Sequence, residues 1–334
     1  MLTDIFARRY QEVPLWHDFT DQHRRLLVQC FQLVEQIAPY YQDGKASDHG
    51  KAFWTTAHDL MARELGVNHL SPLVMGFYNP QKQWVSHTYS MYHICENWML
   101  QTFDFEFGAA DTFLKERFSF VEIAFRNKER TITEAIETFK NFSPTTRRIR
   151  DHDEFLKKFY EEMNEKFRSA VNELNARFRQ AGCNLHYHNG FIQIATDEVV
   201  TEKIETPVWA LLSDAKWKNV DHDLKEAFDL RDADGRDPAF YAARALESTI
   251  KIISDEQSLT TGNERGASNN IDNLRRGKII DGWEADALKA FFSHVRNPLG
   301  HGPGSGDMPS LAPHQTNWAI ETGMIWIKSL ILRR

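Results

Sequence analysis

Residues 296–301 (Arg-Asn-Pro-Leu-Gly-His) combine side chains whose chemistry can cleave RNA. The imidazole of His301 can take a proton from a ribose 2′-OH or give one to the leaving oxygen. The guanidinium of Arg296 can stabilise the charge that develops on the phosphate. The expected product is a 2′,3′-cyclic phosphate, and DNA, which lacks the 2′-OH, would be spared. This chemistry calls for no metal and no cofactor.

The spacing of this motif sets a condition on the backbone. In a regular helix, side chains five positions apart point about 140° apart, so Arg296 and His301 could not meet one substrate. Pro298 disfavours helical geometry at Asn297, and Gly300 and the glycines that follow disfavour a simple continuation of the helix. We therefore expect Arg296 at a helix C-terminus and His301 in a tight turn just beyond it.

The last hundred residues contain four stretches that read as helices and would position this motif. Asp237-Pro238 predicts a helix start, with Asp237 as the N-cap and proline at the first helical position. The predicted helices cover residues 238–254, 271–280, 283–295 and a last stretch from about Gln315. Together they predict a four-helix bundle.

An Arg-Asn-x3-His motif at the end of the third helix of such a unit resembles the signature of HEPN-domain ribonucleases. The resemblance implies that Arg296 and His301 are catalytic, that Asn297 orients the phosphate or the imidazole, and that two protomers form a homodimer around one RNA cleft. It also implies an acidic residue on the first long helix facing the motif, and Glu247 matches that pattern. An alternative interpretation places Glu247 in a surface salt bridge with its helical neighbours, Arg244 or Lys251.

The first 200 residues also read as mainly helical. Helices are predicted over residues 19–41, over 51–65 with Gly66 as the stop, over 110–140 with Asp111 as the N-cap, and over 153–180. Residues 76–84 read as a loop. Residues 185–196 alternate around Asn189-Gly190, which predicts a β-hairpin. The expected organisation is a mainly α fold: a helical domain with a small hairpin (1–200), a connector (201–236) and the HEPN-like bundle (237–334).

The N-terminal region resembles that of AbiJ-type abortive-infection proteins of bacteria. The resemblance is carried by Arg8-Arg9-Tyr10, by the run 175–178 (Asn-Ala-Arg-Phe) and by the hairpin residues 186–190. It implies a variable N-terminal domain before a HEPN effector and a role in anti-phage defence. An antitoxin or a phage-derived trigger would then control the effector.

Composition and charge fit a soluble globular protein of the cytoplasm. The net charge is −7, but from Pro238 onward 11 Lys/Arg stand against 10 Asp/Glu, so the acidic excess lies in the first two-thirds. The three cysteines are far apart and odd in number, which indicates no disulfide framework. The N-terminus lacks the pattern of a signal peptide, and the apolar stretch 318–332 is interrupted by charges and too short to span a membrane.

Metal-binding and phosphate-loop patterns are weak throughout. His186 and His188 share a strand face but have no acidic or thiol ligand at a suitable spacing, so we predict no metal there. The cluster at residues 87–95 is equally weak. Asp232, Asp234 and Asp237 do not fit a calcium loop, since Ala243 stands where the closing Glu belongs.

The sequence thus predicts a metal-independent endoribonuclease toxin acting on RNA, without identifying tRNA, rRNA or mRNA as the substrate. Two alternatives stay open. One is a non-catalytic HEPN module that binds RNA or a protein. The other is a helical sensor whose N-terminal domain binds a phage-derived ligand.

Overall fold

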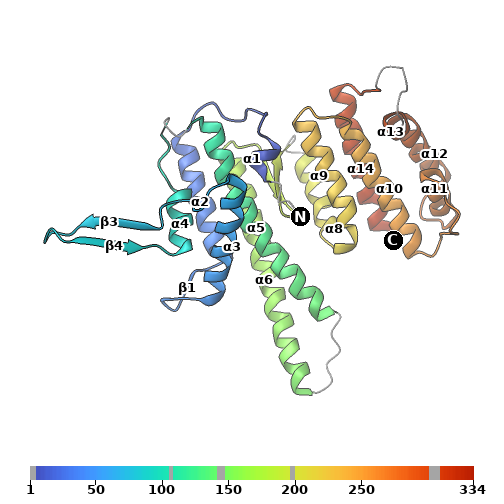
Figure 1. Cartoon of the computed structure of the whole chain (residues 1–334). Coiled ribbons are helices and arrows are strands. Elements are labelled where there is room, and N and C mark those ends of the chain that lie inside the picture. Colours follow the sequence, from blue (N-terminus) through green and yellow to red (C-terminus); the bar gives the residue numbers. More distant parts are fainter. Residues whose placement is uncertain (1–4, 105–107, 141–146, 196–199, 301–308) are drawn as a thin grey trace. The chain divides into compact units, whose positions relative to one another are not determined.

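The computed structural model describes the chain except for residues 1–4, 105–107, 141–146, 196–199 and 301–308. The fold is mainly helical, as the sequence predicts (Figure 1). The chain divides into two units, Met1–Ile194 and Ala195–Arg334, and each has its own hydrophobic core. Among the residues described, no helix combines the length and apolar character that a membrane span needs.

Helices dominate the first unit and bury a core rich in aromatic side chains. They begin and end where capping residues allow. Thr20 caps the second helix, Ser47 caps the third, and Gly66 ends the third in the left-handed conformation that glycine favours (φ 71°). The helices are α1 (Phe6–Arg9), α2 (Asp21–Ile37), α3 (Asp48–Leu65), α4 (Met91–Met99), α5 (Ala110–Lys140) and α6 (Arg147–Gln180), of which α5 and α6 form a long pair (Figure 1).

The prediction of a loop over residues 76–84 was right for residues 79–83, which form a turn, and wrong for residues 76–78 and 84, which belong to strands. Strands β3 (Val74–Tyr78) and β4 (Trp84–Thr88) form an antiparallel hairpin that projects from the helices of this unit (Figure 1). Every residue of β4 is exposed. Because β4 buries no residue, its sequence lacks the apolar–polar alternation by which strands are recognised. A shorter hairpin, β1 (Tyr41–Gln42) and β2 (Lys45–Ala46), precedes α3.

The hairpin predicted around Asn189-Gly190 is confirmed. Strands β5 (Leu185–His188) and β6 (Phe191–Ile194) pair with His188 opposite Phe191, so the turn contains two residues. Both turn residues have positive φ (41° and 86°), as a type I′ turn requires. Unlike β3–β4, this hairpin is largely buried in the first unit.

The second unit contains the four helices expected in the last hundred residues, and it also takes helices from the segment expected as a connector. Val208, Trp209, Leu224 and Phe228 from that segment are buried in the same core as Leu246 of α10. The elements are η2 (Thr201–Glu205), α8 (Thr206–Leu212), η3 (Ala215–Trp217), α9 (Lys218–Asp232), α10 (Pro238–Glu256), α11 (Ala267–Arg276), α12 (Gly282–Phe291), η4 (Phe292–Arg296), α13 (Asn297–Gly300) and α14 (Pro313–Arg333).

Two predicted N-caps were wrong, although both helices begin close to where they were expected. Asp237 precedes α10 in a left-handed conformation (φ 56°), and its carboxylate accepts from Arg236 instead of capping the helix. Asp111 lies inside the first turn of α5, where its carboxylate accepts the backbone N–H groups of Leu15 and Trp16. In each case a tertiary or neighbouring donor competes successfully with the helix end.

Candidate active site

Arg296 lies in a π-helical turn and not at a helix C-terminus, so the predicted helix end was wrong. The turn η4 follows α12 directly, and the N–H of Asn297 donates to the carbonyl of Phe292, five residues earlier. Asn297 has helical dihedral angles (φ −65°, ψ −44°), and α13 continues through Pro298. A π-turn already interrupts the regular i→i−4 bonding, so the missing N–H of Pro298 costs less there.

The carboxylate of Glu247 on α10 faces Arg296. One oxygen of Glu247 lies 3.4 Å from a terminal nitrogen of Arg296, and the other lies 2.8 Å from Nζ of Lys251, one helical turn further along α10. The Glu247 side chain is only 9% exposed, whereas that of Arg296 is 32% exposed. The nearly buried carboxylate of Glu247 therefore holds the guanidinium of Arg296 in place, and part of the Arg296 side chain stays exposed to solvent.

Phe240 and Gly300 also shape the surroundings of Arg296. From the sequence, Gly300 was expected only to oppose continuation of the helix, and Phe240 was not identified. The guanidinium carbon lies 6.0 Å from the centre of the Phe240 ring. A Cβ at Gly300 would stand 3.2 Å from Phe240 and 3.6 Å from Arg296, so the glycine permits close packing of α13. A signal was present in the sequence: Phe240 and Glu247 are seven residues apart, which places them on one face of α10.

Arg244 belongs to a different ion pair. Its Nε donates to Asp223 of α9 at 2.9 Å, and hydrogen bonding to that carboxylate raises the pKa of Arg244. Of the two salt-bridge partners considered for Glu247, the structure thus brings together Glu247 and Lys251, with Arg296 as the further partner. Arg244 holds α9 against α10.

Asn297 is exposed next to Arg296, and His301 lies outside the described residues. Glu247, Lys251 and Arg296 together carry one negative and two positive charges, so this cluster keeps a net positive charge that would attract a phosphate. Within the described part of the chain, the buried Nε of Arg296 has no hydrogen-bond acceptor. An anion can therefore bind to the exposed part of the guanidinium, which excludes the buried Nε.

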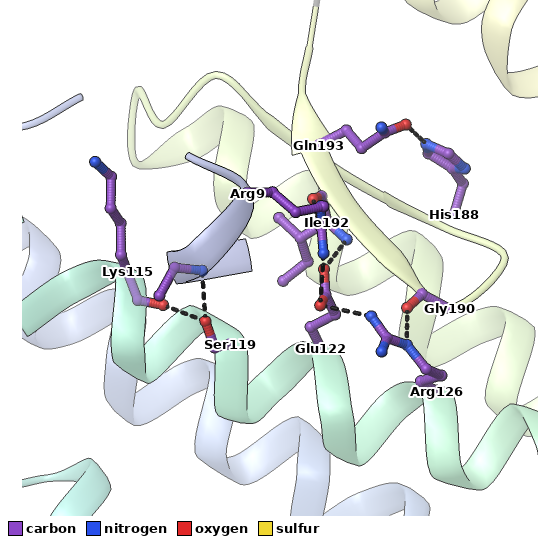
Figure 2. Close-up of polar contacts among 10 residues, drawn as sticks. Arg9, Lys115, Ser119, Glu122, Arg126, His188, Gly190, Ile192 and Gln193 are labelled. Atoms are coloured by element: carbon purple, nitrogen blue, oxygen red, sulfur yellow. Dashed lines mark hydrogen bonds and ion pairs between the residues drawn. The ribbon is translucent and has the colours of Figure 1, made fainter. Parts of the chain in front are cut away.

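The first unit contains a second cluster of charges, whose carboxylate is fully buried. Figure 2 shows Glu122 of α5 between Arg9 of α1 and Arg126, at 2.7 and 2.6 Å, with the N–H of Ile192 donating to the same carboxylate at 2.7 Å. Arg126 also donates to the carbonyl of Gly190. Burial alone would raise the pKa of Glu122, but the two guanidinium groups and the N–H lower it. This cluster ties α1, α5 and the buried hairpin together.

The other polar residues that the sequence indicated in the first unit belong to the β5–β6 hairpin or contact it. The amide of Asn175 on α6 donates to the carbonyl of Tyr187 and accepts its N–H, at 3.0 and 2.7 Å. His188 contacts Gln193 at 2.8 Å (Figure 2). Burial, with a smaller contribution from Arg179, lowers the pKa of His186 to about 4. In the described part of the chain, no group of three or more His, Cys, Asp or Glu side chains is arranged to hold a metal ion.

Comparison with known proteins gives one family. The model described as AbiJ N-terminal domain 4 matches residues 4–210, which is more than half of the chain. The match includes all the described elements of the first unit and continues into α8 of the second. Searches of the curated proteins and of the solved structures returned no match.

Proposed function

Since this chain belongs to the AbiJ N-terminal domain 4 family, and thereby to the AbiJ-type abortive-infection proteins, we propose that it is a metal-independent endoribonuclease toxin of anti-phage defence. In this proposal the second unit is a HEPN-like effector, and Arg296, Asn297 and His301 form its catalytic motif. The first unit regulates it in response to a phage-derived trigger or an antitoxin.

The observation that supports the proposal is the contact between Arg296 and Glu247. Residues 49 positions apart in the sequence face each other, as the HEPN pattern implies, and the guanidinium is both anchored and partly open. Arg9 in the first unit, by contrast, has its charge enclosed and is only 3% exposed. Here a phosphate can approach the guanidinium while Glu247 holds it in place.

The proposed reaction transfers the phosphate within the RNA strand. His301 takes the proton of the 2′-OH as the 2′ oxygen forms a bond to phosphorus, and the bond from phosphorus to the 5′ oxygen breaks. A second acid protonates that leaving 5′ oxygen. Arg296 stabilises the negative charge of the five-coordinate phosphate, and Asn297 orients the phosphate or the imidazole.

A homodimer would supply the second acid. The attacking and leaving oxygens lie on opposite sides of the phosphorus, so one histidine cannot readily serve both. Two protomers would bring two copies of the motif to one RNA cleft, one histidine as base and the other as acid. Each protomer alone would then hold an incomplete site.

One observation supports the alternative function as a sensor. The β3–β4 hairpin exposes apolar side chains on both of its faces: Val74, Tyr78 and Trp84 on one, Met75 and Val85 on the other. Grouped exposed apolar side chains are typical of a surface that meets a partner. This hairpin is a candidate contact for the trigger in either case. What distinguishes the two functions is whether the second unit cleaves RNA.

The test is cleavage by Arg296→Ala and His301→Ala proteins beside the wild type. RNA ends are sequenced after induced expression, and rates are measured on purified RNA with and without EDTA. We expect each substitution to reduce the rate by about 10²–10⁴-fold without unfolding the protein, and we expect wild-type cleavage to survive EDTA. Arg265→Ala and His222→Ala, which replace exposed residues of the same types elsewhere in the second unit, are the matched controls.

Three outcomes would contradict parts of the proposal. If both motif variants cut as fast as the wild type, Arg296 and His301 are not catalytic, and continued toxicity would favour the sensor function. Dependence on added Mg²⁺ would indicate a metal nuclease. Full cleavage by a protein that sediments only as a monomer would contradict the shared cleft.

A further inference from the structure

The second unit has a cavity of about 590 Å³ where four of its elements meet. It lies between the C-terminal end of α9, the N-terminal end of α10, the short helix α13 and the N-terminal end of α14. Its apolar walls include Leu230, Ala239, Leu299 and Leu311. The volume is within the range of small-molecule sites, and no established role accounts for it.

The cavity shares a wall with the Arg296 site. Leu299 belongs to the same single turn, α13, as Asn297, and follows Arg296 by three residues. On the opposite side Ala239 lines the cavity, and the next residue, Phe240, packs near Arg296 and Gly300. A ligand that extended from Arg296 along α13 would enter this cavity.

Two polar side chains of α14 line the cavity and could form hydrogen bonds with a ligand. Thr316 lines the cavity, is 8% exposed as a residue, and has a hydroxyl that can both donate and accept a hydrogen bond. Asn317 is exposed beside it and offers an amide that can both donate and accept. A hydroxyl and an amide on one side of a cavity with apolar walls can fix the orientation of a ligand that bonds to both.

The charges at the rim indicate a neutral ligand. Arg231 and Arg236 line the cavity, but so do Asp234 and Asp237, and Arg236 is already bonded to Asp237 at 2.9 Å. Arg231 is likewise held by Asp232 at 2.7 Å. Two cations thus stand against three carboxylates, so the cavity has no surplus positive charge for a phosphate, unlike the cluster around Arg296.

We propose that this cavity binds the nucleobase of a nucleotide adjacent to the cleaved phosphate and so determines where the RNA is cut. A nucleobase is neutral, has flat faces that suit the leucine and proline walls, and has edges that bond to hydroxyl and amide groups. This inference rests on the proposed function, because it assumes that the phosphate of the same RNA lies at Arg296.

The test compares the wild type with Thr316→Val and Asn317→Ala. Thr316→Val keeps the shape of the side chain and removes the hydroxyl, and Asn317 is exposed, so neither change disturbs the core. Asn219→Ala, an exposed amide at the other end of α9, is the control. Cleavage of an RNA with randomised sequence is sequenced at its ends, and binding of the four free nucleosides is measured by titration with His301→Ala protein.

We expect the wild type to prefer one base at a position next to the cut, and each variant to lose roughly tenfold of that preference, the effect of about one hydrogen bond. The preferred nucleoside should bind the His301→Ala protein, and binding should weaken by a similar factor when Thr316→Val is added. An unchanged preference in both variants would overturn the inference. Nucleoside binding that depends on Thr316 in a chain that cuts no RNA would support the cavity and refute the proposed function, so the two failures are distinguishable.

Discussion

The two units contain charge clusters of the same composition in opposite environments. Each has one carboxylate between two cations: Glu122 with Arg9 and Arg126 in the first unit, Glu247 with Arg296 and Lys251 in the second. The side chains of Glu122 and Arg9 are 0% and 3% exposed, whereas that of Arg296 is 32% exposed. In these two clusters, the buried arginine holds parts of the fold together, and the partly exposed arginine is the one that a substrate could reach.

The energetic consequences differ accordingly. A buried charge that loses its partner has no water to replace it, so breaking the Glu122 cluster should cost mainly stability. A partly exposed pair contributes little to stability because water screens it. Changes around Glu247 should therefore act on the chemistry of the site. Three further experiments test this difference.

Replacing Glu122 should have the largest effect. Glu122→Ala leaves the buried Arg9 and the partly exposed Arg126 without their carboxylate, and we expect it to destabilise the first unit by about 3–5 kcal/mol. Hydrogen exchange at the amides of β5 and β6, which this cluster holds, measures the loss in the full chain. Glu122→Gln, which keeps the shape and some hydrogen bonds, should cost less. A loss of stability below about 1 kcal/mol would mean that the Glu122 cluster contributes no more than an exposed ion pair. The difference between the Glu122 and Glu247 clusters would then disappear.

Acid should weaken the first unit next most strongly, through His186. Its pKa is about 4 in the folded chain and near 6.5 when unfolded, so between these values the unfolded chain binds the extra proton and stability falls as the pH falls. The contribution is fully present above pH 6.5, and about 2–3 kcal/mol is lost by pH 4.5.

The measurement compares wild type with His186→Gln, which cannot titrate. Amide exchange at β5–β6 is followed at pH 7 and at pH 4.5, after correction for the intrinsic exchange rate at each pH. The difference in opening free energy between the two pH values should be smaller in the variant. Equal differences would show that the acid sensitivity of the first unit comes from its carboxylates alone.

Replacing Glu247 should have the smallest effect on free energy, and that effect should appear in the rate. Glu247→Gln removes the charge that orients Arg296, and we expect RNA cleavage to fall about tenfold, equivalent to about 1.4 kcal/mol of barrier. Stability should change by less than about 1 kcal/mol. Glu256→Gln, which removes a carboxylate of α10 that pairs with Lys216 and Arg334 outside this cluster, is the control and should leave the rate nearly unchanged. A large loss of stability with an unchanged rate would make Glu247 structural, like Glu122.

Local patterns predicted most of the helices. Ala243, Leu246, Ile250 and Ile253 recur at helical spacing, and all four are fully buried in α10. Asn189-Gly190 likewise predicted its hairpin, since few residue pairs tolerate positive φ at both positions. Such elements depend on residues close in the sequence, so the sequence alone identifies them.

The features that escaped prediction depend on distant or unusual partners. Arg244 binds Asp223, 21 residues earlier, although Glu247 stands closer in the sequence. The π-turn before Asn297 carries a proline through a helix, against the local preference. At the candidate site, the facing of Glu247 and Arg296 followed from a family resemblance and not from spacing. Whether residues 237–334 act as a separate effector domain stays a prediction.

The family match ends at residue 210, whereas the first unit ends at Ile194. This difference determines where chimeras of such proteins should be joined. Val208 and Trp209 lie inside the matched segment but are buried in the second core, and Lys328 of α14 donates to the carbonyl of Lys203. A graft joined after residue 210 would import a foreign helix into the recipient's second core. A graft joined near residue 195 would leave the recipient's second core with its own α8. The segment that can be exchanged between such proteins is therefore shorter than the segment that the family shares.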